Sequence, residues 1–466
     1  MSLLHAPFTR TLWKDKRVLI LGLGQYPKGS GVSAALAFAK LGAKVVVTDE
    51  KEEADLKANV DQLRKYKNVR FVLGKHELSD IDEAEIVVAN PRVRPTSPMM
   101  QRARKKGIPV TSDIALFLDR CPAQVVAITG TRGKSTTTTL IAEMLKASGK
   151  KVWLGGNILV SPLTFVSKVK AKDIVVLELS SWQCESLGMS SHQPHVSVVT
   201  NLMRDHLNAY EGMEDYAEAK AQIFRHQGPD DVVIFNADDA LGNRWTKEAP
   251  GRVLTFGKKG KIARVKNGVL LLDGKEVIKE TQMQLMGEHN VMNALAAMVA
   301  AREAGASIKG IKTVLKTFKG LENRLQVIRE HQGVTYINDT TATTPDAAIA
   351  ACKAMLPRAN FLFFIMGGAD KELEYAELGV VLKKAKKRIG IFLFPGKASE
   401  KMVKEFNRNG IAYEEVGDMK TAVQRASEVA QSGDAIILSS AAASFGLFKN
   451  EFDRGEQFVK AVKHLK

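Results

Sequence analysis

Short runs of apolar, often β-branched residues alternate along the chain with longer stretches whose apolar residues recur every three or four positions. The short runs predict strands buried in a parallel sheet, and the longer stretches predict amphipathic helices. Strands are expected at 17–21, 44–48, 69–73, 85–89, 125–129, 173–179, 196–200, 336–338, 361–366, 388–394 and 435–439, and helices at 32–40 and 216–224 among others. Alternating strands and helices predict the α/β class.

These runs fall into three groups, which predict three domains with boundaries at 1–113, 114–320 and 321–466. A chain of 466 residues is long enough for two to four domains with separate cores. The first and third domains are expected to be Rossmann-like α/β units, and the central domain to be a P-loop ATPase-like domain with a parallel sheet. No repeated sequence period is found.

The chemistry of the chain centres on a stretch at 125–137, which reads Val-Val-Ala-Ile-Thr-Gly-Thr-Arg-Gly-Lys-Ser-Thr-Thr. A strand ends at Gly130, and a helical pattern starts just after Gly133 and Lys134. Loop N–H groups and a helix N-terminus favour a bound phosphate, Lys134 adds a positive charge, and Ser135 can hold Mg²⁺. A usual P-loop has a glycine where this chain has Ile128, so an ordinary strand–helix turn is the alternative. The preceding strand and the threonine run favour phosphate binding.

The first strand–helix–strand unit is of the dinucleotide-binding type, with glycines at 22–24 and Asp49 where a ribose would bind. The residues at 25–28 separate these glycines from the next ones at 29–31, so the usual glycine spacing is broken. This favours nucleotide recognition without redox chemistry. Arginines in the proline-rich loop at 90–95 could hold a diphosphate or could simply be solvated.

Polar residues follow the strands predicted for the central domain. Glu178 ends an apolar strand, where a carboxylate is costly unless it is paired or bound to a metal. Asp205 and His206 follow the next strand, at the edge where α/β proteins bind ligands. Mg²⁺ binding is one interpretation; a hydroxyl-bonded carboxylate and a helix cap are the alternatives.

Two more features of this domain are ambiguous taken singly. Lys220 lies in the helix predicted at 216–224 and would ordinarily be a surface lysine. Asn290 and Asn293, three positions apart at the start of an alanine-rich helix, would face one side, where they could bind a base or ribose or cap the helix.

In the last third, strand ends rich in glycine, serine and threonine could face a small anionic substrate. They include the stretches 339–345, 367–371 and 440–444.

Composition narrows the choice of function. The formal charge of +17 suits anionic partners, but no nucleic-acid motif with interleaved aromatic residues is present, so a solvated basic surface is preferred. No apolar run is long enough to span a bilayer, and three scattered cysteines favour a reducing compartment, so we expect a cytoplasmic protein that binds neither nucleic acid nor membrane.

Taken together, the ordered motifs resemble the Mur ligases, an ATP-dependent family that adds amino acids to the peptidoglycan precursor. The resemblance covers essentially the whole chain. It is carried by 129–137, Gly155–Ile158, Glu178–Gln183, Asp205–Leu207 followed by Lys220, Gly287–Asn293, and Arg324.

The resemblance implies roles for individual residues. ATP would be bound by Gly130, Thr131, Arg132, Gly133, Lys134, Ser135, Thr136, Asn290, Asn293, Arg324 and Asp339. Two Mg²⁺ ions would be held by Ser135, Glu178, His206 and Lys220, the last as a carbamate; Lys134, Glu178, His206 and Lys220 would be catalytic. UDP-N-acetylmuramoyl-L-alanine would be bound by Gly24, Gln25, Asp49, Glu50, Asn90, Asn157, Ser180 and Gln183, and glutamate by Thr343, Lys371 and Ser444. The family reaction runs through an acyl phosphate, and a monomer is expected.

Three departures leave the added amino acid open. Thr341 stands where a lysine is usual, Glu451 where an aromatic residue is often found, and the loop at 25–31 is inserted. L-Glutamate or another amino acid remains an alternative to D-glutamate. Outside the family, the alternatives are a nucleic-acid-stimulated NTPase and, on the first βαβ unit alone, an NAD-dependent oxidoreductase.

Overall fold

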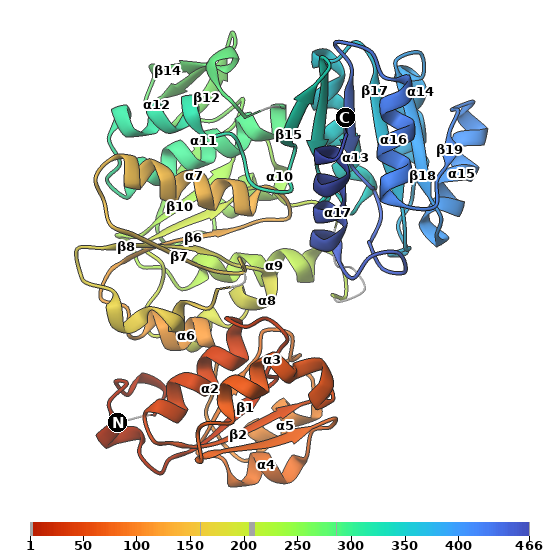
Figure 1. The fold of residues 1–466 in the computed structure, drawn as a ribbon. Helices are drawn as coiled ribbons and strands as arrows, with labels where there is room; N and C mark the ends of the chain where they lie inside the picture. The colour runs from red at the N-terminus through yellow and green to blue at the C-terminus, as the bar shows by residue number, and fades with distance from the viewer. Residues whose placement is uncertain (1–2, 159, 205–209, 286, 466) are drawn as a thin grey trace. The chain divides into compact units, whose positions relative to one another are not determined.

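The computed structural model describes residues 3–158, 160–204, 210–285 and 287–465, and it confirms the α/β class. It divides the chain into two compact units, one of Met1–Gln282 with Met292–Lys316, the other of Met283–Val291 with Thr317–Lys466. Figure 1 shows the chain coloured from its N-terminus to its C-terminus. The predicted strands all occur, and their ends differ from the observed ones by no more than two residues, which is the usual uncertainty of an element boundary.

The N-terminal part of the first unit contains a parallel sheet with the strand order β3-β2-β1-β4-β5. Its strands are β1 (Arg17–Leu21), β2 (Lys44–Asp49), β3 (Val69–Leu73), β4 (Ile86–Ala89) and β5 (Val110–Thr111). The helices are α1 (Arg10–Trp13), α2 (Ser30–Lys40), α3 (Glu53–Leu63), α4 (Leu78–Glu83), α5 (Pro98–Lys105) and α6 (Asp113–Leu118). The strand order reverses beside β1, so the loops after β1 and β4 face the place where such sheets bind ligands.

The insertion after β1 leaves the close packing of α2 intact. A Cβ atom at Gly31 would lie 2.1 Å from the carbonyl oxygen of Gly22, so only glycine allows this approach. The extra residues form a turn, closed by a hydrogen bond from the Gly29 N–H to the Tyr26 carbonyl at 2.9 Å. Gly31 therefore has the role of the last glycine in a dinucleotide-binding turn, although the sequence spacing differs.

The rest of the first unit is organised by a second sheet with the order β14-β13-β12-β11-β10-β9-β6-β8-β7. The strands are β6 (Gln124–Thr129), β7 (Val152–Gly156), β8 (Ile174–Glu178), β9 (Val196–Val199), β10 (Val232–Asn236), β11 (Arg252–Phe256), β12 (Ala263–Lys266), β13 (Val269–Leu272) and β14 (Lys275–Lys279). The helices are α7 (Lys134–Ala147), α8 (Ser181–Cys184), α9 (Met213–Arg225), α10 (Ala240–Trp245), α11 (Glu288–Glu303), which begins in the second unit, and α12 (Ile308–Thr317). The sheet is parallel except where β13 pairs with β12 and β14. The order reverses at β6, which places the loop after β6 at the expected ligand position.

The second unit contains a sheet with the order β15-β16-β20-β17-β18-β19, parallel except for the β15–β16 pair. The strands are β15 (Gln326–His331), β16 (Val334–Asn338), β17 (Leu362–Gly367), β18 (Ile389–Phe394), β19 (Glu414–Glu415) and β20 (Ala435–Leu438). The helices are α13 (Pro345–Met355), α14 (Ala376–Ala385), α15 (Lys397–Asn409), α16 (Met419–Val429) and α17 (Glu451–Lys463). Short 3-10 turns elsewhere in the chain span Leu3–His5, Pro162–Thr164, Val166–Lys168, Leu187–Met189, Glu280–Gln282 and Leu356–Arg358.

Alternation along the strands divides this unit's core between the two faces of the sheet. Ile337 and Ile437 pack with residues of α13, α14 and α15, whereas Tyr336 and Ile436 pack with residues of α16 and α17 (Figure 1). The loops after β16, β17 and β20 share one edge of the sheet, where the serine- and threonine-rich stretches lie. Within the described ranges, no helix is long and apolar enough to cross a membrane.

Candidate active site

The loop between β6 and α7 is built on two glycines whose backbone and close neighbours disfavour any side chain. Gly130 has φ 143°, and a Cβ atom there would lie 1.9 Å from Thr200 Oγ1. Gly133 has φ 79°, and a Cβ atom there would lie 2.1 Å from Asn293 Oδ1. Glycine is therefore favoured both by the left-handed backbone and by the close neighbours. The predicted ATP residue Asn293 contacts this loop directly.

Asn201, just after β9, holds the loop in shape, although sequence analysis did not include it among the site residues. Its Oδ1 accepts a hydrogen bond from the Arg132 N–H at 2.9 Å, and its Nδ2 donates to the Arg132 carbonyl at 3.0 Å. Its own carbonyl accepts from the Thr131 N–H at 3.0 Å. Its position at a strand end beside β6 was the signal that could have identified it.

Two lysine ammonium groups converge on one oxygen of this loop. Lys134 Nζ and Lys220 Nζ each donate to the Gly130 carbonyl at 2.9 Å, and Lys134 also donates to the Thr131 carbonyl at 3.0 Å. Lys220 is only 2% exposed, and its ammonium lies 4.7 Å from the ring centre of Tyr216, one turn earlier in α9. The surface-lysine interpretation of Lys220 is therefore wrong, and the structure brings Lys220 to the phosphate loop.

Glu178, at the end of β8, has the features expected of a metal ligand. It is 2% exposed; Oε1 accepts from Asn157 Nδ2 at 2.9 Å, while Oε2 is buried and has no hydrogen-bond partner in the part of the chain that the structure describes. A buried carboxylate oxygen without a donor is costly unless a cation occupies its open side. The Glu178 carboxylate, oriented by Asn157, therefore fits the role of a Mg²⁺ ligand.

Of the other expected metal ligands, the structure describes Ser135 but not His206. His206 lies outside the described residues, together with Asp205. Ser135 is in the first turn of α7, in the same loop–helix junction as Lys134. Among the described residues, no three His, Cys, Asp or Glu side chains form a group that could hold a metal ion. The fit for a metal thus depends on Glu178 with the hydroxyl groups around the loop, because a lysine ammonium has no lone pair to offer a cation.

Asp49 is engaged by the glycine turn after β1. Its Oδ2 accepts hydrogen bonds from the N–H groups of Leu23 at 2.8 Å and Gly24 at 3.1 Å. Asn59 Nδ2 donates to the Gly24 carbonyl at 2.6 Å from the other side. In this structure the Asp49 carboxylate shapes the turn that would surround a nucleotide.

The other predicted residues of the N-terminal sheet lie around the same edge. Asn90 follows β4, and its Nδ2 donates to the Gly22 carbonyl at 3.3 Å. Gln25 Nε2 lies 3.5 Å from the Asp55 carbonyl, and the Glu50 side chain is 84% exposed. Asn90 is thus held against the glycine turn, while Glu50 extends into solvent.

Ser180 and Gln183 form a capping box at the start of α8. The Ser180 hydroxyl accepts from the Gln183 N–H at 3.2 Å, and Gln183 Oε1 accepts from the Ser180 N–H at 3.0 Å. Both side chains therefore stabilise the helix that follows Glu178.

In the second unit, Asp339 and Arg324 lie on neighbouring segments. Asp339 accepts from the Leu325 N–H at 3.1 Å and from the Ser439 hydroxyl at 3.0 Å, and burial raises the pKa of its carboxyl to about 7. Arg324 stands between Asn323 and Leu325, which have φ values of 65° and 43°. This unusual backbone fixes the direction of the exposed Arg324 side chain.

Asn290 lies in the first turn of α11 and is 8% exposed. Its neighbour His289 is exposed at the surface, and partial desolvation by surrounding atoms, with the nearby charge of Arg324, lowers the pKa of the imidazole. The segment before Asn293 therefore carries a neutral histidine close to Arg324.

The three residues expected at the amino-acid site come from three loops at one sheet edge. Lys371 Nζ, after β17, donates to Thr343 Oγ1, after β16, at 3.1 Å. Ser444, after β20, is 3% exposed, and its neighbour Ala443 exchanges backbone hydrogen bonds of 2.9 and 3.1 Å with Ala369. The structure thus brings Lys371 and Thr343 into contact and ties the Ser444 loop to the Lys371 loop.

The two departures from the family pattern in this unit have structural roles. Thr341 Oγ1 donates to the Asn323 carbonyl at 2.9 Å, so it supports the loop that carries Arg324. The Glu451 carbonyl accepts from the Thr340 hydroxyl at 2.7 Å at the start of α17.

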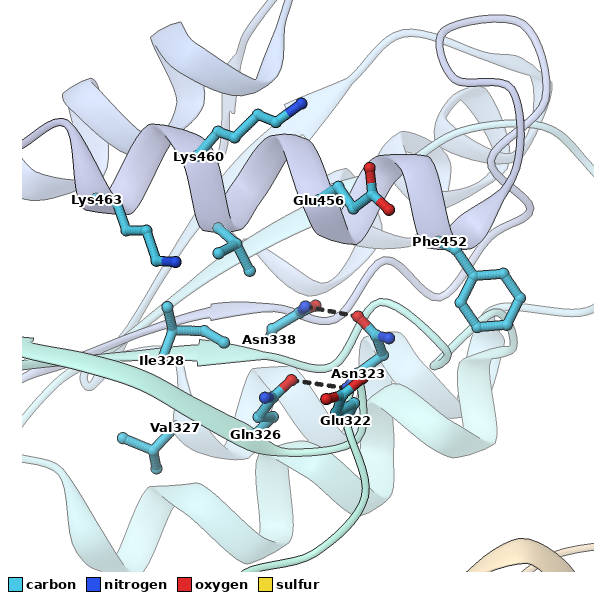
Figure 2. Close-up of a pocket in the computed structure, with 11 residues that line it drawn as sticks. Glu322, Asn323, Gln326, Val327, Ile328, Asn338, Phe452, Glu456, Lys460 and Lys463 are labelled. Carbon is cyan, nitrogen blue, oxygen red and sulfur yellow. Dashed lines mark hydrogen bonds between the residues drawn. The ribbon is translucent and has the colours of Figure 1, made fainter.

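Figure 2 shows a groove of about 650 Å³ between α17 and the start of β15. Its floor includes Asn323 and Asn338, joined by a hydrogen bond of 2.8 Å, and its charged lining residues are two glutamates and two lysines. Its lining contains none of the residues predicted for ATP, metal or substrate binding. The candidate site therefore lies at the strand ends and not in this groove.

Three family models match consecutive parts of the chain. The Mur ligase MurD-like N-terminal domain matches residues 16–112, the Mur ligase middle domain matches 128–301, and the Mur ligase glutamate ligase domain matches 323–442.

Relatives with similar sequences extend over nearly the whole chain. A UDP-N-acetylmuramoylalanine–D-glutamate ligase of Roseiflexus sp. (strain RS-1) is 36% identical over 466 residues, which cover 96% of this chain and 98% of that protein. A ligase with the same description from Borreliella afzelii (strain PKo) is 35% identical and covers 97% and 98% of the two chains.

Solved structures share the fold at lower identity. The MurF ligase of Thermotoga maritima in complex with ADP is 19% identical, with a TM-score of 0.60 and 99% of both chains covered. The UDP-N-acetylmuramate–alanine ligase of the same organism is 21% identical, with a TM-score of 0.59 and coverage of 97% and 100%.

Proposed function

The chain belongs to the Mur ligase family, and from that premise we propose that it joins D-glutamate to UDP-N-acetylmuramoyl-L-alanine in peptidoglycan precursor synthesis. It is an ATP-dependent ligase that forms an amide bond. The observation that carries this conclusion is 34–36% identity, over nearly the full chain, to several D-glutamate ligases. This similarity favours D-glutamate over the L-glutamate that Thr341 and Glu451 left open.

The reaction overcomes the low reactivity of a carboxylate. ATP phosphorylates the alanine carboxylate to an acyl phosphate, the amino group of D-glutamate attacks the acyl carbon, and phosphate leaves. Lys134 is well placed to neutralise charge as two anions approach, because its ammonium already lies in the phosphate loop. Water must be kept from the acyl phosphate, which a closed site would achieve.

The metal and carbamate assignments are part of the same proposal. Ser135, Glu178, His206 and Lys220 would hold two Mg²⁺ ions, which when bound neutralise phosphate charge. The buried, donor-free Oε2 of Glu178 supports a cation there. A carbamate on Lys220 would form by addition of CO₂ to the amine with release of a proton, turning a cation into an oxygen ligand. The burial of Lys220 beside the phosphate loop supports this role.

The remaining residues are assigned by binding partner. Gly130–Thr136, Asn290, Asn293, Arg324 and Asp339 bind ATP; Gly24, Gln25, Asp49, Glu50, Asn90, Asn157, Ser180 and Gln183 bind the uridine-diphosphate substrate; Thr343, Lys371 and Ser444 bind glutamate. We assign binding of the uridine-diphosphate substrate to a domain at 1–113, ATP binding to a central domain at 114–320 and amino-acid binding to a domain at 321–466. The enzyme acts as a cytoplasmic monomer, without nucleic acid or membrane.

The test is a coupled assay of ADP and phosphate release. Release should require UDP-N-acetylmuramoyl-L-alanine and D-glutamate together, and mass spectrometry should find the amide product. L-Glutamate in place of D-glutamate should give no product. ATP hydrolysis that is stimulated by DNA or RNA and is independent of both substrates would contradict the proposal.

A further inference from the structure

Arg454, in the first turn of α17, is a buried arginine that sequence analysis did not identify. It is 1% exposed, and its guanidinium donates three hydrogen bonds. Nε donates to Thr340 Oγ1 at 3.1 Å, Nη2 to the Thr340 carbonyl at 2.7 Å, and Nη1 to the Ala442 carbonyl at 3.1 Å. All three acceptors are neutral oxygens.

The two acceptor residues belong to different loops of the amino-acid site. Thr340 is three residues before Thr343 in the loop after β16, and Ala442 is two residues before Ser444 in the loop after β20. One planar, rigid side chain therefore spans the loops that carry two of the three glutamate-binding residues. The same loops are also joined by a backbone hydrogen bond from the Ala441 N–H to the Ala342 carbonyl at 2.9 Å and by the Ser439 hydroxyl, which donates to Asp339 at 3.0 Å.

The first turn of α17 packs closely against the loops that carry Asn323 and Thr340. At Gly455, a Cβ atom would lie 2.7 Å from both Asn323 Oδ1 and Thr340 Cγ2, so glycine lets the helix approach. Figure 2 shows Asn323 and Asn338 hydrogen-bonded beneath α17. The helix start is thus held from both sides, because Thr340 also donates to the Glu451 carbonyl.

A packing role alone does not call for a charged group at this position. Taking a guanidinium out of water is costly even when it is hydrogen-bonded, and an apolar side chain of similar size often packs as well or better. Burial lowers the pKa of Arg454 to about 10, so the group stays protonated at neutral pH and donates all its hydrogen bonds. The charge is better explained by the two loops, at Thr340 and Ala442, whose oxygens the guanidinium holds in place.

We propose that Arg454 is a positioning residue for the glutamate site, setting the separation of the Thr343 and Ser444 loops without touching substrate. The inference rests on the proposed function, since it concerns the amino acid which that function assigns to these loops. Loss of the guanidinium should weaken glutamate binding and leave ATP binding largely unchanged.

The test compares Arg454→Met and Arg454→Lys with the wild-type enzyme in steady-state assays. For Arg454→Met we expect the KM for D-glutamate to rise about tenfold or more, with the KM for ATP changing by less than about twofold. The KM of Arg454→Lys for D-glutamate should lie between those of the wild type and Arg454→Met, because an ammonium cannot match the planar spacing of the three acceptors.

Arg329→Met is the matched control. Arg329 on β15 also anchors α17, but at the far end of the helix, where Nη1 donates to the carbonyls of Val462 and Leu465 at 3.1 Å. The Arg329→Met substitution should lower the midpoint of thermal unfolding and leave the KM for D-glutamate unchanged. Equal shifts in Arg329→Met and Arg454→Met would show that loosening of α17 is the cause and would overturn the inference.

Two further outcomes also decide the matter. If both Arg454 variants fail to fold while Arg329→Met folds, or if they raise every KM alike, Arg454 is a general structural residue and the inference is wrong. If the wild-type enzyme itself shows no turnover with D-glutamate, the proposed function fails first, and the inference falls with it.

Discussion

Asn157 donates a hydrogen bond to one carboxylate oxygen of Glu178 at 2.9 Å, and the other oxygen of Glu178 is buried with no partner among the described residues. The amide therefore orients the carboxylate while leaving one oxygen for a ligand. This arrangement is typical of a metal ligand held by a neighbouring group.

Glu178→Gln tests the metal assignment. The amide keeps the size of the side chain and can still accept from Asn157, but it lacks the negative charge that a cation requires. We expect kcat to fall by about 100-fold or more and the Mg²⁺ requirement to rise, measured by ADP release across a magnesium titration. Asp173→Asn, before the opposite end of β8, is the control: it should weaken the bond to Trp153 and lower stability while kcat stays near wild type. Full activity in Glu178→Gln would contradict the assignment.

Lys220→Ala should abolish ligation, because it removes the group that would carry the carbamate. Formate or acetate should partly restore turnover by occupying the space left by the side chain beside Gly130. Lys220→Arg, which keeps a positive charge but cannot carry a carbamate, should stay inactive with or without the added acid. Rescue is measured as the initial rate against acid concentration; an active Lys220→Arg variant would show that charge alone suffices.

Gly133→Ala should impair ATP binding through the contact with Asn293. Gly149 is a matched control, because it has nearly the same φ, 78° against 79°, but no heavy atom within 4 Å of the added Cβ. The left-handed alanine alone should cost each variant about 1 kcal/mol of unfolding free energy, and Gly133→Ala should lose more through its close contact with Asn293. Only Gly133→Ala should also raise the KM for ATP, by about tenfold or more, since its Cβ displaces Asn293. Similar ATP kinetics in the two variants would contradict a role for this contact.

Lys371→Ala should raise the KM for D-glutamate by about tenfold or more, since a charge-assisted hydrogen bond to a carboxylate is worth about 1.5–3 kcal/mol. The KM for ATP should rise less. Thr343→Val, which removes the hydroxyl that Lys371 contacts, should have a smaller effect in the same direction. Lys397→Ala, an exposed lysine at the start of α15, is the control and should behave as wild type. A larger effect of Lys371→Ala on ATP than on glutamate would mean that the site is misassigned.

Asp339→Asn should change how stability depends on pH. The pKa of Asp339 rises from 3.8 to about 7 on folding because the carboxyl is buried. Between about pH 4 and 7 the native state keeps a proton that the unfolded chain has released, so wild-type stability falls as pH rises, by up to about 1.4 kcal/mol per pH unit. The stability of Asp339→Asn relative to wild type should therefore increase across this window and level off above it, as measured by urea unfolding.

Asp418→Asn provides a control of opposite sign. Hydrogen bonds from Thr421 lower the pKa of Asp418, so its stabilising effect is present at neutral pH and is lost only in acid. The difference in unfolding free energy between Asp418→Asn and wild type should be constant between about pH 5 and 8. A flat difference for Asp339→Asn over the same range would show that its carboxyl is ionised in the folded protein.

The sequence predicted most of the buried parallel strands, such as β8 and β17, because each is a continuous apolar run. It did not predict β5, β7, β10, β11, β15 and β19, nor the hairpin strands β12–β14, of which β12 and β14 carry charged residues. Local signals for the hairpin strands were present nonetheless. Asn267–Gly268 and Asp273–Gly274 join these strands with four positive φ values, which is the backbone that two-residue hairpin loops require.

The candidate site was less predictable. The glycines and Lys134 follow a local spacing, and a strand end identified Glu178 as a costly buried charge. Arg454 had no such signal, because it lies in a helix start with many charged neighbours, and its burial arises only when that turn packs against the Thr340 loop, 114 residues earlier, as well as the nearby Ala442 loop. Contacts of this range depend on topology, which no local pattern encodes.

Gly130 accepts from both Lys134 and Lys220 at 2.9 Å, so the two nitrogens can be no more than about 6 Å apart, close enough for like charges to repel strongly away from bulk water. An anion bound beside these two ammonium groups would weaken that repulsion. Addition of CO₂ to Lys220 would give it a negative charge, so that Lys220 would attract Lys134 instead of repelling it. Formation of the carbamate would then also stabilise the phosphate loop.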